Sequence, residues 1–373
     1  MRTLDQKQLE DLIRGCAILG TGGGGSPSRG LRLIRGDLQA GREFKLADLG
    51  EIPDDALVAS PYMCGSVSPE AAGAGPSPSD EETECLEAFQ ALETYLGRPF
   101  FAAVATEIGG GNTAAALCVA ARQGIPIVDA DPAGRSVPEL QHTTFYIKGV
   151  PIAPLAVATA AGDVLIVKEV SDDFRAEAIV RAVAVVSDNR AGVADHPMEG
   201  RSLQETVVPG TLSKALAIGA AVREARSSGA DPVQAAVAAG EGHVLFRGTV
   251  TEADWKIEEG FTVGELTISG IDHDSDHTYR IWYKNEHIVS WFDGQPDVTA
   301  PDLICVLDPK SGEAITNPNC QKGMEVAVVG YPAPALWRTL TGLEVFGPKH
   351  FGFDIPYRPI EENPRLSWLS SRK

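Results

Sequence analysis

The sequence predicts an α/β protein with two domains, an N-terminal α/β domain with a mostly parallel sheet and a β-rich C-terminal domain. The first indication is a pair of apolar segments, 101–105 and 125–128, that flank a glycine-rich turn and the alanine-rich segment 113–122. This strand–helix–strand order is typical of parallel βαβ units. The second is a series of short apolar segments separated by Gly and Asp turns from residue 243 onward. A length of 373 residues also exceeds one typical core.

Before residue 170 the chain predicts alternating helices and strands, because its apolar residues change between helical and strand spacing. A capping-box pattern of Thr3 and Gln6 opens the first helix. The further expected elements are a second helix over 30–38, a strand over 56–60, a loop over 64–80, a helix start at Glu81, Glu82 and Glu84, the βαβ unit above, and a hairpin of 156–160 with 164–167.

We place the domain boundary near residue 170, which gives domains of 1–170 and 171–373. The second domain begins with helices near 174–186 and 211–226, and its β-rich part covers about 243–331. The tail over 346–354 is aromatic, so we expect it to pack back on the body of the protein.

Composition and charge restrict the class of partner. The formal net charge of −19 argues against a nucleic-acid backbone or an anionic membrane surface. Six cysteines without CxxC spacing predict reduced thiols, a cytoplasmic location and no structural zinc. The charged N-terminus lacks the apolar stretch of a secretory signal, and no apolar run of about 18 residues predicts a membrane span. The expected partners are a small-molecule substrate and further copies of the chain.

The glycine-rich segment 20–27 is the first candidate for ligand contact. It lacks the Gly-Lys-Ser/Thr ending of a P-loop and follows a helix, so it is not a nucleotide motif. Backbone N–H groups around Gly23 and Gly24 can bind an anionic group at the start of the next helix. Alternatively, the glycines serve only a tight turn.

A second candidate follows the predicted strand over 101–105. Glu107 supplies a carboxylate at the strand end, and the glycines around Gly110 allow the backbone to approach a ligand. Asn112 then starts a helix. We favour a catalytic Glu107 and a substrate-binding Asn112, because a carboxylate beside a buried turn needs a partner. The alternative is that Asn112 only caps the helix.

The segment 129–139 combines three carboxylates with one arginine. Asp129 or Asp131 can serve as general base toward a water molecule, and Arg135 can bind a substrate carboxylate through two hydrogen bonds. Glu139 and the nearby His142 are further substrate-binding candidates. The alternative is an Asx turn with a structural Asp131–Arg135 ion pair.

The remaining candidates are more isolated in the sequence. Cys64 can be a nucleophile or a buried inert thiol. Asn285 and Glu286 lie between two strands and either project into an interdomain cleft or form a hairpin turn. The histidines and carboxylates at 272–277 indicate a solvated turn rather than a metal site. A catalytic metal held by carboxylates and His142 stays open, and no cofactor is otherwise indicated.

Several of these segments together resemble the S-methyl thiohydantoin desulfurase family. The resemblance rests on segments along nearly the whole chain, namely 19–24, 107–112, 129–139, 210–213, 284–286, 301–304 and 351–352. It implies an α/β N-terminal domain, a β-rich C-terminal domain and an association with hydantoinase/oxoprolinase-type proteins. The chain departs from the family where many members have a Gly-Ala-Pro-Thr-Val-like loop, since residues 64–67 read Cys-Gly-Ser-Val.

The implied reaction is hydrolysis at C2 of an S-methylated thiohydantoin, or of a related cyclic amide, with release of methanethiol. Attack by water needs a base, for which Glu107 or Asp129 are the candidates, and a donor for the charge on the ring nitrogen. Asn112 and Arg135 would orient the ring and a side-chain carboxylate, and a covalent route through Cys64 is a variant. The alternatives are a non-catalytic partner subunit of a hydantoinase-type enzyme and a small-ligand-binding protein.

Overall fold

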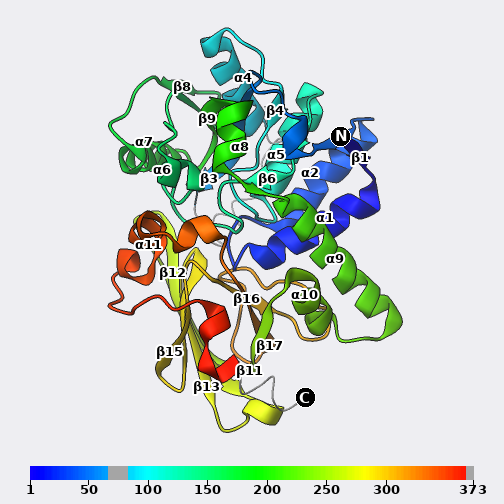
Figure 1. Ribbon diagram of the computed structural model, residues 1–373, viewed down its shortest axis with the longest axis vertical. Helices are drawn as coiled ribbons and strands as arrows, with labels where there is room; N and C mark the ends of the chain where they lie inside the picture. The colour runs from blue at the N-terminus through cyan, green and yellow to red at the C-terminus, as the bar shows by residue number, and fades with distance from the viewer. Residues whose placement is uncertain (66–82, 367–373) are drawn as a thin grey trace.

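The computed structural model describes residues 1–65 and 83–366. A large sheet with helices on both faces, sheet A, forms the upper body in Figure 1, and an antiparallel sheet, sheet C, forms the lower body. The predicted fold class, α/β with a β-rich C-terminal part, is confirmed. The expected loop over 64–80 lies outside the described residues from position 66 onward, as do Glu81 and Glu82.

Sheet A has a parallel centre and antiparallel edges. Parallel pairing joins the four central strands, and antiparallel pairs extend the sheet on both sides. Its strand order is β1 (Arg2–Leu4), β2 (Phe44–Ala47), β5 (Ile127–Val128), β4 (Ala102–Ala103), β3 (Leu57–Gly65), β9 (Arg190–Glu199), β7 (Leu155–Ala158) and β8 (Val164–Val167).

Hydrophobic cores lie on both faces of this sheet because successive strand residues point to opposite sides. Ala103 and Ile127 belong to one core, whereas their neighbours Ala102 and Val128 belong to another. The first core is covered by α1 (Gln6–Leu19), α2 (Pro27–Gln39), α4 (Glu84–Leu96) and α5 (Asn112–Gln123). The opposite face is covered by α6 (Thr144–Lys148), α7 (Asp173–Val186) and α8 (Gly200–Thr206).

Strand β9 comes from beyond residue 170, where we placed the domain boundary. It pairs with both β3 and β7, so it lies inside sheet A. A strand edge without a partner leaves backbone N–H and C=O groups unsatisfied, and β9 supplies those groups for β3. Sheet A therefore contains strands from before and from after residue 170.

Sheet C is antiparallel throughout and spans His243–Tyr331. Its strand order is β15 (Gln295–Thr299), β14 (Glu286–Phe292), β13 (Thr278–Lys284), β12 (Phe261–Gly270), β11 (His243–Glu258), β17 (Glu325–Tyr331) and β16 (Leu303–Leu307). A separate two-stranded ribbon pairs β6 (Ala130–Asp131) with β10 (Val208–Pro209).

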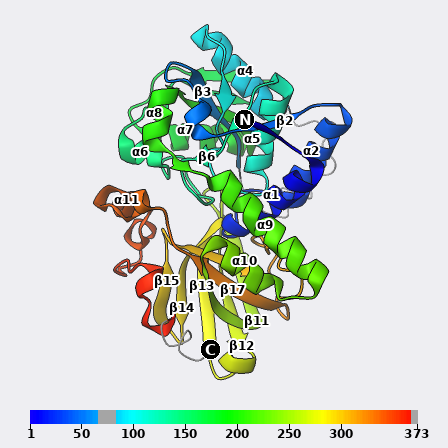
Figure 2. The same ribbon diagram turned by 45° about the vertical axis from the view of Figure 1, so that its right-hand side comes forward.

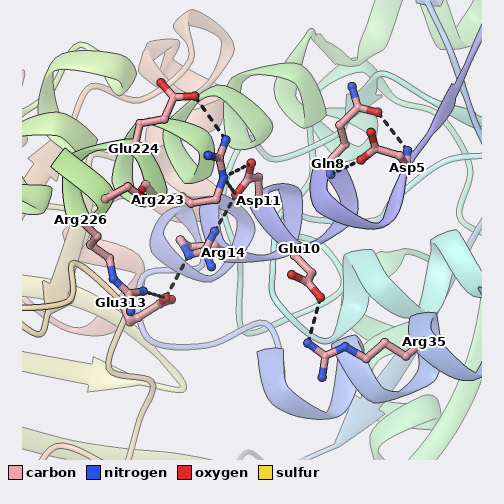
Figure 3. Close-up of polar contacts among 11 residues, drawn as sticks. Asp5, Gln8, Glu10, Asp11, Arg14, Arg35, Arg223, Glu224, Arg226 and Glu313 are labelled. Atoms are coloured by element: carbon pink, nitrogen blue, oxygen red, sulfur yellow. Dashed lines mark hydrogen bonds and ion pairs between the residues drawn. The ribbon is translucent and has the colours of Figure 1, made fainter.

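Two helices connect the upper and lower bodies. Helix α9 (Thr211–Ser228) packs along α1, and α10 (Pro232–Gly240) packs on α9 and on β17 (Figure 2). Polar contacts reinforce the α1–α9 packing: buried Asp11 accepts hydrogen bonds from Arg14 and Arg223 (Figure 3). Glu313, after β16, accepts from Arg14 and Arg226, which links both helices to the C-terminal body.

The C-terminal tail packs back on the body, as its aromatic composition predicts. It contains η3 (Ala335–Arg338), α11 (Leu340–Phe346), η4 (Pro348–Phe351) and η5 (Ile360–Glu362). Trp337 is fully buried and donates from its indole Nε1 to the carbonyl of Ala133 at 2.8 Å. The tail therefore covers the segment that follows β6.

Two local predictions need correction. The cap of α1 is Asp5, which forms a capping box with Gln8, and not Thr3 with Gln6. Thr3 is instead part of β1, where it pairs with Lys45. Strand β3 also extends to Gly65, because β9 provides an antiparallel partner over the whole of its length. Cys64 consequently lies inside a strand and not in the loop that we expected.

Candidate functional site

Glu107 lies between the end of β4 and the start of α5, and its carboxylate is held from two directions. Its Oε1 accepts a hydrogen bond from Asn112 Nδ2 at 2.8 Å, and its Oε2 accepts one from the Val137 backbone N–H at 2.8 Å. Asn112 is itself fixed, because its Oδ1 accepts from the Met63 N–H at 3.0 Å. Only 4% of Glu107 is exposed. Glu107 and Asn112 thus form a rigid unit at the strand ends.

The glycine-rich loop before α2 packs directly on this unit. The carbonyl of Gly24 accepts hydrogen bonds from the backbone N–H groups of Gly111 at 2.8 Å and Asn112 at 3.0 Å. Gly24 has a φ of +71°, which favours glycine at this position. A Cβ atom at Gly110 would lie 2.8 Å from Pro27 Cβ, so Gly110 serves the close approach of the two loops.

Glu286, the first residue of β14, reaches this cluster from the C-terminal body. It is 2% exposed, and its Oε2 has no hydrogen-bond partner among the described residues. A Cβ atom at Gly23 would lie 1.7 Å from Glu286 Oε1, so only glycine leaves room for this carboxylate. Gly23, Gly24 and Glu286 therefore meet at the junction of the two bodies.

Burial and mutual repulsion alter the protonation of the two carboxyl groups. Burial raises the pKa of Glu107 to about 7, although the hydrogen bonds from Val137 and Asn112 and the charge of Arg135 oppose the rise. Burial and the neighbouring Glu107 charge raise the pKa of Glu286 well above its usual range. Near neutral pH, Glu286 therefore keeps its proton, whereas Glu107 can gain or lose one.

Arg135 lies fully buried beside this pair, and all five of its N–H groups have protein acceptors. They donate to the carbonyl oxygens of Ser136, Pro301, Asp302 and His287 and to Thr21 Oγ1, at 3.0 to 3.1 Å. The guanidinium has five donors in total, so none is left for a substrate carboxylate. Arg135 thus joins the segment after β6 to the C-terminal body instead of forming the expected carboxylate clamp.

The two aspartates that follow β5 make structural contacts. Asp129 accepts hydrogen bonds from the backbone N–H of Ser213 at 2.9 Å and from its hydroxyl at 2.5 Å, so it caps the start of α9. Asp131 Oδ2 accepts from the N–H groups of Ala133 and Gly134, both at 2.8 Å. These bonds form the Asx turn that we considered as the structural alternative for this segment. Asp129 is thus held at the start of α9, whereas Asp131 stays a general-base candidate beside Glu107, because burial raises its pKa to about 7.

Cys64 and Asn285 also have structural surroundings. Burial raises the pKa of the Cys64 thiol to about 12, although the nearby Arg181 charge opposes this, so the thiolate nucleophile is scarce near neutral pH. Asn285 has a φ of +56° between β13 and β14, and its Oδ1 accepts from the Thr262 N–H at 2.9 Å. Asn285 therefore forms the hairpin turn, and Glu286 next to it is the residue that enters the cluster.

A second polar cluster surrounds Glu139, four residues after Arg135 in the chain. His142 Nε2 lies 3.1 Å from Nε2 of His350, and Lys284 forms an ion pair with Glu139. Sequence reasoning selected Glu139 and His142 but missed His350 and Lys284. The aromatic tail around His350 was a usable signal, since a segment expected to pack back on the body brings its polar residues with it.

Taken together, the fold and the cluster define a two-domain α/β protein with a buried carboxylate pair at the junction of its bodies. The S-Me-THD-like N-terminal domain family matches residues 7–169, and the S-Me-THD-like C-terminal domain family matches residues 171–360. The chain belongs to this S-Me-THD-like family, which confirms the resemblance to S-methyl thiohydantoin desulfurases.

The fold also recurs in a solved structure. A structural-genomics crystal structure of a protein from Chromobacterium violaceum superimposes with a TM-score of 0.80 at 24% sequence identity. The match covers 96% of this chain and 100% of that one. A comparison with curated proteins finds no match. Within the described residues, no helix is both long and apolar enough to cross a membrane.

Proposed function

We propose that this protein hydrolyses an S-methylated thiohydantoin, or a related cyclic amide-like compound, with Glu107 as the acid–base group. The observation that carries the proposal is the state of Glu107: a buried carboxylate, oriented by Asn112 and Val137, whose pKa is raised to about 7. General acid–base catalysis works best when the pKa of the group lies near the operating pH. The family to which the chain belongs supports the substrate class.

The chemistry needs one group that first takes and then returns a proton. Water adds to C2 of the S-methyl isothiourea unit while the Glu107 carboxylate takes a proton from it. The C2–S bond then breaks, and protonated Glu107 delivers the proton to the departing methanethiolate. The second water proton goes to the ring nitrogen, so the products are a hydantoin and methanethiol. Protonated Glu286 adds no second negative charge beside the reacting Glu107.

The test is release of methanethiol from S-methyl thiohydantoin propionate by the purified protein. A thiol reagent can follow the reaction, because all six cysteines are buried and react slowly. We expect turnover with the S-methyl compound and formation of the matching hydantoin, identified by its mass. Binding of the substrate without any turnover would instead support the ligand-binding alternative and refute the hydrolase.

A further inference from the structure

The cluster of Glu139, His142 and His350 has the geometry of a metal site. One ligand atom from each residue lies within 4.8 Å of the others, and the two Nε2 atoms are 3.1 Å apart. Tetrahedral zinc with Zn–N bonds of about 2.0–2.1 Å places two nitrogen ligands about 3.3 Å from each other. The two Nε2 atoms, which share a hydrogen bond in this structure, are therefore also close enough to each other to bind a single ion.

We propose that these three side chains bind one divalent transition-metal ion, with zinc as the first choice, through both Nε2 atoms and a Glu139 carboxylate oxygen. Two imidazoles and one carboxylate form the ligand set of many catalytic zinc sites, in which a further position stays open to water or substrate. This inference is independent of the proposed hydrolysis, since it concerns metal binding alone.

The fold holds the three ligands together from two distant parts of the chain. A turn in which the His142 N–H donates to the Glu139 carbonyl at 3.0 Å brings the first two side chains onto one side. His350 comes from η4 in the C-terminal tail, 208 residues away. Because the tail is anchored by the buried Trp337, the third ligand is positioned by packing and not by chance contact of a free end.

An apolar shell surrounds the histidine rings. The ring centroid of His142 lies 4.8 Å from that of Phe346, and the centroid of His350 lies 4.9 Å from that of Phe351. Exclusion of water strengthens the attraction between an ion and its ligands.

Lys284 is the residue that opposes the ion. Its ammonium group contacts Glu139 Oε1, while Gln141 Nε2 donates to Oε2 at 2.5 Å. Each carboxylate oxygen has a second lone pair for a metal, but the positive charge of Lys284 repels the ion. Replacing Lys284 by methionine should therefore raise the affinity for zinc. If zinc instead bound to exposed carboxylates elsewhere on the surface, the same replacement should change the affinity little.

The test is calorimetric titration of the full chain with zinc sulfate after dialysis against a chelator. We expect one zinc ion per chain, with His142→Phe and His350→Gln each weakening binding by at least about tenfold. Lys284→Met should strengthen it. The matched control is His273→Gln, because His273 is an exposed histidine of η2 outside the cluster and should leave the affinity unchanged.

Absence of saturable binding by the unmodified protein would overturn the proposal. So would equal affinity in the unmodified protein and in His350→Gln, since partly exposed His350 can be replaced with little risk to folding. Circular dichroism of each variant shows that it is folded. An unchanged or lower affinity in Lys284→Met would exclude Glu139 as a ligand. Because no substrate is present, failure of this site and failure of the proposed hydrolysis are separate results.

Discussion

The side-chain amide of Asn112 donates a 2.8 Å hydrogen bond to Oε1 of Glu107, five residues earlier in the chain. The same amide group is anchored through its oxygen to the backbone of Met63 in β3. The acid–base candidate is therefore tied to helix α5 and, through Asn112, to β3 of sheet A, which limits its motion relative to anything bound at the strand ends.

Glu107→Gln should lower kcat by about 10²–10⁴-fold, because glutamine keeps the shape of the side chain but cannot accept a proton. In the unmodified protein, kcat/KM should rise with pH through about 7, since the base acts only when ionised. Thiol release measured over this pH range checks both points. A variant with normal activity would show that another group is the base.

Asp129→Asn should leave activity nearly unchanged and cost less than about 1 kcal/mol of stability. The oxygen of an asparagine side chain can still accept from the Ser213 N–H, and its amide N–H can donate to the Ser213 hydroxyl oxygen. This substitution is the matched control for Glu107→Gln, because both replace a carboxylate by an amide near a strand end. A large loss of kcat with normal thermal stability would return Asp129 to the list of catalytic candidates.

Arg135→Lys should lower the free energy of unfolding by about 3 kcal/mol or more while leaving substrate affinity nearly unchanged. Lysine has three donors for the five acceptors that now surround the guanidinium, so buried acceptors lose their partners. Urea unfolding and KM measured on the same variant decide the point. Weaker substrate binding with unchanged stability would support the carboxylate clamp instead.

Gly23→Ala should destabilise the protein and reduce activity, because the new Cβ atom would lie 1.7 Å from Glu286 Oε1. Gly23 does not have a positive φ, so the effect would come from this contact and not from backbone strain. Gly36→Ala in α2 is the control: nothing lies within 4 Å of that position, and alanine should stabilise the helix by about 0.5–1 kcal/mol. Thermal unfolding of both variants tests the contrast.

His196 should make stability fall at alkaline pH. Burial lowers the pKa of His196, but the charge and hydrogen bond of Asp195 and the charge of Asp173, 3.7 Å from Nε2, outweigh this and raise it to about 9. The folded protein therefore binds a proton that the unfolded chain releases above about pH 6.5. This contribution, on the order of 3 kcal/mol, is complete below pH 6.5 and disappears as the pH rises through 9.

Urea unfolding of the unmodified protein and of His196→Gln, at several values between pH 6 and 10, tests this expectation. The stability difference between the two proteins should shrink as the pH rises, because only the unmodified protein loses a proton at this site. A difference that stays constant over the whole range would show that folding does not raise the pKa of His196.

The sequence by itself determined the features that depend on residues close together in the chain. The strand–helix–strand order of residues 101–128 predicted the parallel centre of sheet A, and the same segment placed Glu107 at a strand end and Asn112 at the start of the following helix. Family membership followed from the order of several short segments along the whole chain.

Only the tertiary structure decided which polar groups share a partner. The sequence left Arg135 either as a carboxylate-binding group or in an ion pair with Asp131, yet its acceptors include Thr21 and His287, which are 114 and 152 residues away. Glu286 and His350 reach the N-terminal body in the same way, through packing of sheet C and of the tail. A buried charge must find its hydrogen-bond partners wherever the fold places them, so its role depends on long-range packing that local spacing does not encode.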